Sequence, residues 1–216
     1  MSRIAALITL ALSCHAYSVE PRIEVGQVYS QYVGQSSSDT DWKFTAGIKD
    51  FPLYLFYDQE TPEVRLLGQD LGYSDVQTIG LGLRYDATQK LSAFAEIGYS
   101  DTSTDVLYST QQEIVATHLI DRHYIEGIRE LPFSGPFHEP YGYDTEYTLD
   151  DGYSTRIGIA YQICRWASFK VSYKCLKMDE YMAVFDSDMR EAGLGFWEER
   201  STRDFDAIEF GVFLTY

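Results

Sequence analysis

The sequence predicts an all-β fold, a closed antiparallel up-and-down transmembrane β-barrel of eight strands with long outer loops. Three observations predict this fold. Apolar and polar residues alternate along several segments, which is typical of strands with two different faces. Short and long connections alternate between those segments. All six prolines lie outside the strand interiors, and a closed barrel has no edge strand to tolerate them.

The composition agrees with a single domain and excludes several classes of protein. The chain has 216 residues, of which 33 are acidic and 17 are Lys or Arg, so its formal net charge is −16. This acidity argues against a nucleic-acid partner, because a phosphate backbone needs a basic surface. A hydrophobic content of 45% can form a core, which argues against disorder. No apolar run reaches the roughly 20 residues of a spanning helix.

The N-terminal segment has the pattern of a secretory signal peptide, which we place at residues 1–16. Arg3 supplies a positive start, residues 4–12 are apolar, and Ala16 ends a pattern of small residues. Cleavage after Ala16 leaves 17–216 as one barrel domain, with 16 basic and 33 acidic residues and a charge of −17. Lipidation of Cys14 is the alternative, although the residues before it form a poor lipobox.

Alternation places the strands in order along the chain. The expected strands are 22–32, 42–49, 52–58, 77–86, 91–99, 153–163, 167–175 and 206–216. One face of each clear strand is apolar, and the other carries small residues and scattered charges: Arg84, Glu96, Arg156, Lys170 and Glu209. If the apolar face contacts lipid, these charges fill a narrow interior and must form a paired network there, because buried unpaired charges are costly.

Aromatic residues at strand ends support the membrane interpretation, because amphipathic rings favour the level of the headgroups. We expect Trp42 and Tyr99 at the outer rim and Tyr85 and Trp166 at the inner rim. The opposite arrangement, a soluble periplasmic barrel, would place the apolar face inside around a small apolar ligand and the charges in water.

Short and long connections alternate, as expected when short turns lie at one end of a transmembrane barrel and long loops lie at the other. The short ones are 49–52, 86–90 and 164–166, and the long ones are 33–41, 59–76, 100–152 and 178–204. The segment 100–152 is long for a plain loop. It is interpreted as a structured outer loop with an amphipathic helix, or as a strand pair turning at 121–122, which would give ten strands.

The last strand, FDAIEFGVFLTY, ends in an aromatic residue with apolar residues at alternate positions before it: Phe210, Val212, Leu214 and Tyr216. With this strand, the signal peptide and the strand count, the chain resembles the small Gram-negative outer-membrane β-barrels of the OmpA-like and OmpX/Ail-like kind. The resemblance implies export to the outer membrane. It implies contact with its lipid and lipopolysaccharide, and a C-terminal assembly signal read by the barrel-assembly machinery.

Candidate chemical sites are weak. His118, Asp121 and His123 match no zinc or catalytic spacing, and no expected strand carries a histidine. We therefore expect no enzyme activity, no metal and no cofactor. The acidic loop pairs match no calcium-loop spacing. Cys164 and Cys175 are expected to be free thiols, because Cys164 lies in a predicted turn and Cys175 lies far along the strand that follows.

The sequence therefore predicts a structural or surface-interaction protein whose exposed loops contact a host or phage surface ligand. An eight-stranded barrel has an interior that side chains fill, so we expect little or no conductance. A barrel enzyme acting on lipid A or peptides is the alternative within the membrane.

Overall fold

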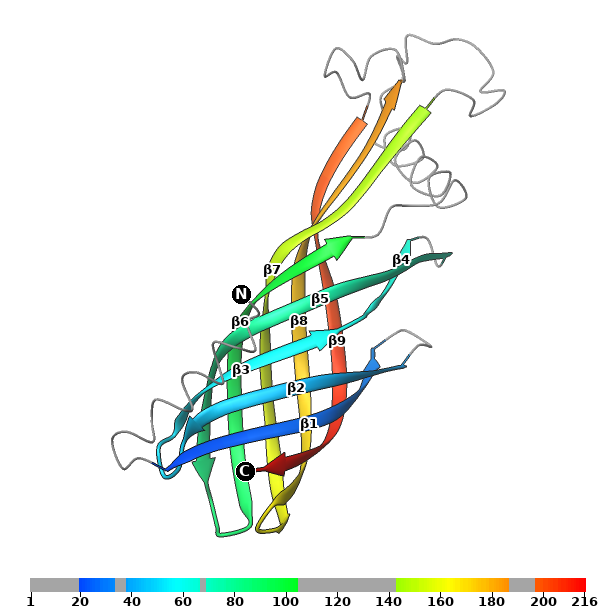
Figure 1. The fold of residues 1–216 in the computed structure, drawn as a ribbon. Coiled ribbons are helices and arrows are strands. Elements are labelled where there is room, and N and C mark those ends of the chain that lie inside the picture. Colours follow the sequence, from blue (N-terminus) through cyan, green and yellow to red (C-terminus); the bar gives the residue numbers. More distant parts are fainter. Residues whose placement is uncertain (1–19, 34–37, 67–68, 105–142, 187–196) are drawn as a thin grey trace.

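The computed structural model describes residues 20–33, 38–66, 69–104, 143–186 and 197–216 (Figure 1). Within these ranges the chain forms antiparallel strands, and no helix there is long and apolar enough to cross a membrane. The strands are β1 (Pro21–Tyr32), β2 (Ser38–Ile48), β3 (Leu53–Glu60), β4 (Glu63–Leu66), β5 (Gln69–Asp86), β6 (Leu91–Thr104), β7 (Tyr143–Cys164), β8 (Ala167–Asp186) and β9 (Trp197–Thr215).

Eight of these strands close into a ring, as the sequence predicts. The order runs from β3 through β2, β1, β9, β8, β7 and β6 to β5, and β3 pairs with β5 to complete the circle. The short β4 continues the line of β3 after Pro62 and pairs with the outer part of β5. Since β6 pairs directly with β7, the ring has no place for two further strands between them, and the ten-strand alternative is wrong.

Many apolar side chains of the barrel wall point outward, and most of the charged side chains beside them point inward. Ile157 and Val212 are 64% and 53% exposed, whereas Arg156 and Glu209 are 2% and 3% exposed. In β6 the exposed and buried positions alternate from Leu91 onward. An exposed apolar surface of this extent requires lipid around it, so the barrel is transmembrane. The soluble barrel with inverted faces is therefore wrong.

Three tight turns join the strands at one end of the barrel. They lie between β2 and β3, between β5 and β6, and between β7 and β8, where the sequence places its short connections. Asp50 takes up a left-handed backbone with φ 65°, which Asp tolerates better than most residues, and the Phe51 N–H donates to the Ile48 carbonyl at 3.1 Å.

The expected loops at the opposite end are wrong in their bounds, because the strands run further than the lipid-facing alternation. β6 continues to Thr104, β7 begins at Tyr143, and β8 and β9 extend through most of the expected loop 178–204. The expected loop 59–76 is mostly β4 and β5. Pairing of β7 with β8 and of β8 with β9 continues above the ring, and Figure 1 shows these three strands rising together beyond the other five.

We call this three-stranded sheet the outer extension and define it as residues 143–151, 176–186 and 197–206. β1 leaves β9 at the pair Tyr32–Ala207, with one further bond from the Val33 N–H to the Asp206 carbonyl. β6 leaves β7 after the pair Ser100–Gly152. Within the described residues, β7, β8 and β9 pair only with one another in the outer extension, and these same strands connect it to the barrel.

Glycines in the wall make room for aromatic side chains in the lumen. A Cβ added to Gly26 would lie 2.3 Å from the Phe213 ring, and one added to Gly82 would lie 2.2 Å from the Tyr54 ring. Each glycine is the direct cross-strand partner of the ring that covers it, Gly26 of Phe213 and Gly82 of Tyr54. The ring fills the space that two larger side chains on neighbouring strands could not share.

Candidate functional site

The centre of the lumen is an ion-pair network around Arg156. Its Nε donates to Glu209 Oε2 at 2.5 Å, its Nη1 donates to Glu96 Oε2 at 2.6 Å, and its Nη2 donates to Asp58. Ser172 donates a further hydrogen bond to Glu209 at 2.7 Å. The planar guanidinium provides donors in several directions, so one arginine can hold carboxylates from three different strands.

Two lysines extend the network along the barrel. Lys43 pairs with Glu96, and Lys174 pairs with Glu60 and, at 3.4 Å, with Asp58. All of these side chains are 3% exposed or less. Three cations and four carboxylates therefore fill the middle of the lumen.

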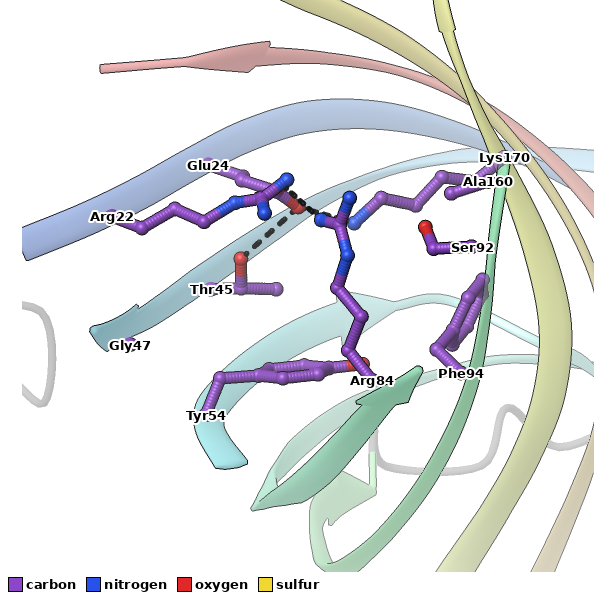
Figure 2. Close-up of a pocket in the computed structure, with 10 residues that line it drawn as sticks. All are labelled: Arg22, Glu24, Thr45, Gly47, Tyr54, Arg84, Ser92, Phe94, Ala160 and Lys170. Atoms are coloured by element: carbon purple, nitrogen blue, oxygen red, sulfur yellow. Dashed lines mark hydrogen bonds and ion pairs between the residues drawn. The ribbon is translucent and has the colours of Figure 1, made fainter. Parts of the chain in front are cut away.

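A separate cluster lies near the tight turns, and we call it the mouth cluster. Glu24 stands at its centre and accepts hydrogen bonds from Arg22 at 2.5 Å, from Lys170 at 2.5 Å and from Arg84 at 3.3 Å (Figure 2). The Lys170 ammonium also lies 3.9 Å from the centre of the Phe213 ring, which fixes its position. Three cations thus surround one carboxylate.

The five charges expected from the sequence are divided between these clusters. Glu96, Arg156 and Glu209 lie in the central network, and Arg84 and Lys170 lie in the mouth cluster. Sequence reasoning missed the remaining members, which are Arg22, Glu24, Lys43, Asp58, Glu60 and Lys174. Lys43 and Lys174 could have been predicted as lumen residues, since both lie on the polar faces of expected strands.

The sequence gives little indication that Asp58 and Glu60 point into the lumen, because the inward face of β3 also carries aromatic residues. Tyr54 and Phe56 precede Asp58 and Glu60 on that face, so hydropathy does not separate it from the lipid-facing side. The Tyr54 hydroxyl donates to Glu96 at 2.8 Å, which ties this face to the central network.

An apolar cluster closes the lumen above the charges. Its members come from β1, β4, β5, β7, β8 and β9, and each is at most 5% exposed. They are Tyr32, Val64, Leu71, Val76, Tyr147, Leu149, Leu176, Met178, Met182, Phe205 and Ala207. The β4–β5 hairpin packs here against the outer extension, and the Arg203 guanidinium donates to the Arg65 carbonyl at 2.5 Å. The barrel is therefore closed by charges in its middle and by apolar side chains above.

The outer extension is strongly acidic. Over residues 146–151, 176–183 and 198–206 it carries nine acidic and three basic residues, a net charge of −6. An open groove of about 580 Å³ runs along this sheet, and it is lined by Glu146, Thr148, Asp150, Asp179, Glu180, Tyr181, Arg200, Ser201 and Thr202. The Arg200 guanidinium lies over the Tyr181 ring at 5.4 Å from its centre.

A buried polar group holds the inner side of the outer extension. Tyr147 donates to Glu180 at 2.8 Å, and Arg203 and Ser201 donate to the same carboxylate at 2.6 Å and 2.9 Å. Burial and the neighbouring Glu180 carboxylate raise the pKa of Tyr147 well above its ordinary value. This phenol therefore stays protonated as a donor at neutral pH.

The expected interface aromatics all lie on the outer surface of the barrel. Trp42, Tyr85, Tyr99 and Trp166 are at least half exposed. The apolar face of the last strand is also exposed, through Phe210, Val212, Leu214 and Tyr216. Both sets therefore lie on the exposed outer face of the barrel.

Cys164 and Cys175 are free thiols, and the Cys175 thiol donates to Asp206 at 2.7 Å. Within the described part of the chain, no group of three or more acidic, histidine or cysteine residues could hold a metal ion. The signal peptide 1–16, the helix or strand pair expected near 121–122, and His118, Asp121 and His123 lie outside the described residues.

Solved structures with a similar fold are outer-membrane barrels. The outer membrane protein OprG from Pseudomonas aeruginosa matches with a TM-score of 0.53 and 13% identity, over 91% of this chain and 95% of OprG. The N-terminal β-barrel domain of Pseudomonas aeruginosa OprF matches with a TM-score of 0.50 and 7% identity, over 92% and 100% of the two chains. No family model and no curated protein matches this sequence. At these identities the likeness establishes a shared fold.

Proposed function

We propose that this barrel lies in the bacterial outer membrane and serves a structural or surface-interaction role, in adhesion or recognition, through its outer extension. The observation that carries the proposal is the extension itself, a three-stranded sheet that stands beyond the lipid-facing wall with a net charge of −6 over its described side chains. A closed lumen supplies only the anchor for such a sheet.

The free edge of β9 indicates how a partner would bind. Above Asp206 this strand pairs with β8 alone among the described strands. Because the Asp206 carbonyl points to the edge, the backbone groups of Asp204, Thr202 and Arg200 point there too. An extended segment of a host or phage surface protein can pair with such an edge by strand addition. The acidic sheet favours a segment rich in Lys and Arg.

The experiment measures retention of vesicles containing the full chain on a surface coated with a lysine-rich peptide of extended conformation. We expect retention at low salt that falls as ionic strength rises, since exposed charges are screened. A variant with Asp150→Asn, Asp179→Asn and Glu198→Gln should lose most of it. A matched control carries Glu20→Gln, Asp50→Asn and Asp86→Asn at the opposite end of the barrel. Equal retention of both variants would contradict the proposal.

Two further partners belong to this proposal. The lipid-facing wall contacts outer-membrane lipid and lipopolysaccharide, and the exposed apolar face that ends at Tyr216 serves as the signal for the barrel-assembly machinery. Replacing Tyr216 by Ser should lower the fraction of heat-modifiable, folded protein in outer-membrane fractions. An unchanged fraction would remove the role assigned to this residue.

The proposal includes no catalytic step, no cofactor and no nucleic-acid partner. The carboxylates of the central network are held by arginine and lysine and are not presented to a substrate.

A further inference from the structure

The mouth cluster has more positive than negative charge and more donors than acceptors. Arg22 uses its Nε and Nη2 on Glu24, and Arg84 uses its Nη1 on Glu24 and its Nε on Asp86. The other guanidinium N–H groups of both arginines have no acceptor among the described residues. Asp86 is 60% exposed, so water screens its charge.

A small cavity lies among these donors. Its volume is about 30 Å³, and its wall includes Arg22, Glu24, Arg84, Ser92 and Lys170. Ser92 is only 2% exposed, and its hydroxyl makes no hydrogen bond to another described residue. Figure 2 shows the two guanidinium groups close to Glu24, with Lys170 and Ser92 on the neighbouring side of the same space. The Ser92 hydroxyl is therefore available as a further hydrogen-bond donor to a group in this cavity.

We propose that the mouth cluster is a binding site for a compact monoanion, a halide or a carboxylate group, that enters from the end of the barrel with the tight turns. Three cations against Glu24 and the exposed Asp86 leave a net charge of +1, and the three cations repel one another more strongly in the lumen than they would in water. An anion between Arg22, Arg84 and Lys170 reduces that repulsion and accepts from the Ser92 hydroxyl. The cavity has room for about two water-sized groups, which a chloride ion or two carboxylate oxygens would fill.

The binding position of the anion is well defined, because other contacts already hold the side chains that would bind it. Lys170 is 9% exposed and its ammonium lies within 5.7 Å of the Phe94 ring centre as well as close to Phe213. Glu24 holds both arginines through its Oε1. Little side-chain freedom remains to be lost when an anion binds, which favours affinity.

The test uses chloride with the full chain folded in detergent micelles, and it measures the line width of the ³⁵Cl resonance. We expect saturable broadening that sodium acetate displaces and that an equal ionic strength of a bulky sulfonate does not. Displacement by acetate identifies a carboxylate-compatible site, and broadening that acetate leaves unchanged restricts the site to halide.

Arg84→Gln and Arg22→Gln should each weaken chloride binding about tenfold, the loss expected for one charge-assisted hydrogen bond. Ser92→Ala keeps every cation and should weaken binding by a smaller factor. Lys177→Gln, which removes a partly exposed cation far from the cavity, is the control and should bind like the parent. A gel shift on heating confirms that each variant is folded.

Broadening that is absent, or that is the same in Arg22→Gln, Ser92→Ala and Lys177→Gln, would overturn the site. The outcome is independent of the outer extension, since the two regions lie at opposite ends of the barrel.

Discussion

Among the three cations of the central network, Arg156 pairs with the most carboxylates. Its guanidinium contacts carboxylates of β3, β6 and β9, and it is itself 2% exposed. Buried ion pairs are not strongly stabilising in themselves, because desolvation offsets their attraction. The loss of one partner is costly, however, because it leaves the other charges buried and uncompensated.

Arg156→Met should therefore lower the free energy of unfolding by about 3–5 kcal/mol. Urea unfolding in lipid vesicles, followed by heat modifiability on gels, measures this loss. Lys177→Gln breaks a partly exposed pair with Asp204 and should cost less than about 1 kcal/mol. A loss in Arg156→Met no larger than in this control would show that the network adds nothing to stability.

The contacts between wall glycines and aromatic rings can also be tested at single residues. Gly26→Val places a branched side chain against the Phe213 ring and should cost about 1–3 kcal/mol through overpacking. Phe213→Leu removes the ring and should recover part of that loss in the double variant. Strictly additive losses in the same unfolding assay would contradict direct contact between these two residues.

At the scale of elements, the sequence predicts the strands well where one face meets lipid and the other meets the lumen. The alternation from Leu91 in β6 and from Ile157 in β7 is clear because both environments are uniform. The outer extension has no such contrast, since water or protein surrounds both its faces. The sequence therefore places Leu149 and Asp150 in a loop, although β7 pairs with β8 up to Leu149 and again from Gly152, after an irregularity at 150–151.

Tyr147 makes the outer extension sensitive to alkaline pH. Its pKa is raised in the folded protein, and an unfolded tyrosine ionises near pH 10. Its contribution to stability is thus fully present below about pH 10 and is lost as the pH rises further. Urea midpoints at pH 8 and pH 11 should differ less in Tyr147→Phe than in the parent. Tyr85→Phe, at an exposed tyrosine, should behave like the parent; an equal decrease in both variants would contradict this role.

For the whole molecule, the eight-stranded ring, its lipid-facing surface and the inward direction of Glu96, Arg156 and Glu209 follow from local patterns of two-residue period. The contacts inside do not, because they join residues far apart in the chain. Arg156 and Asp58 are 98 positions apart, and only ring closure brings them together. The apolar cluster above the charges was missed for the same reason, since its members come from six strands.

The central ion-pair network and the apolar cluster above it both fill the lumen, so we expect the barrel not to conduct ions. Ion-paired side chains fill the middle, and buried apolar side chains such as Met178 and Leu176 fill the space above. Planar bilayers containing the folded full chain should show no stable conductance of porin size. Stable steps of that size, absent from a heat-unfolded sample, would contradict the closed lumen.

The central claim, that the outer extension faces the cell exterior, is tested most directly by labelling intact cells with a membrane-impermeant maleimide. The background carries Cys164→Ser and Cys175→Ser, and each test variant adds one thiol at an exposed position, Thr202→Cys in the outer extension or Gln89→Cys in a tight turn. The account predicts labelling of Thr202→Cys on intact cells and of Gln89→Cys only after lysis. Labelling of Gln89→Cys on intact cells with Thr202→Cys protected would contradict it.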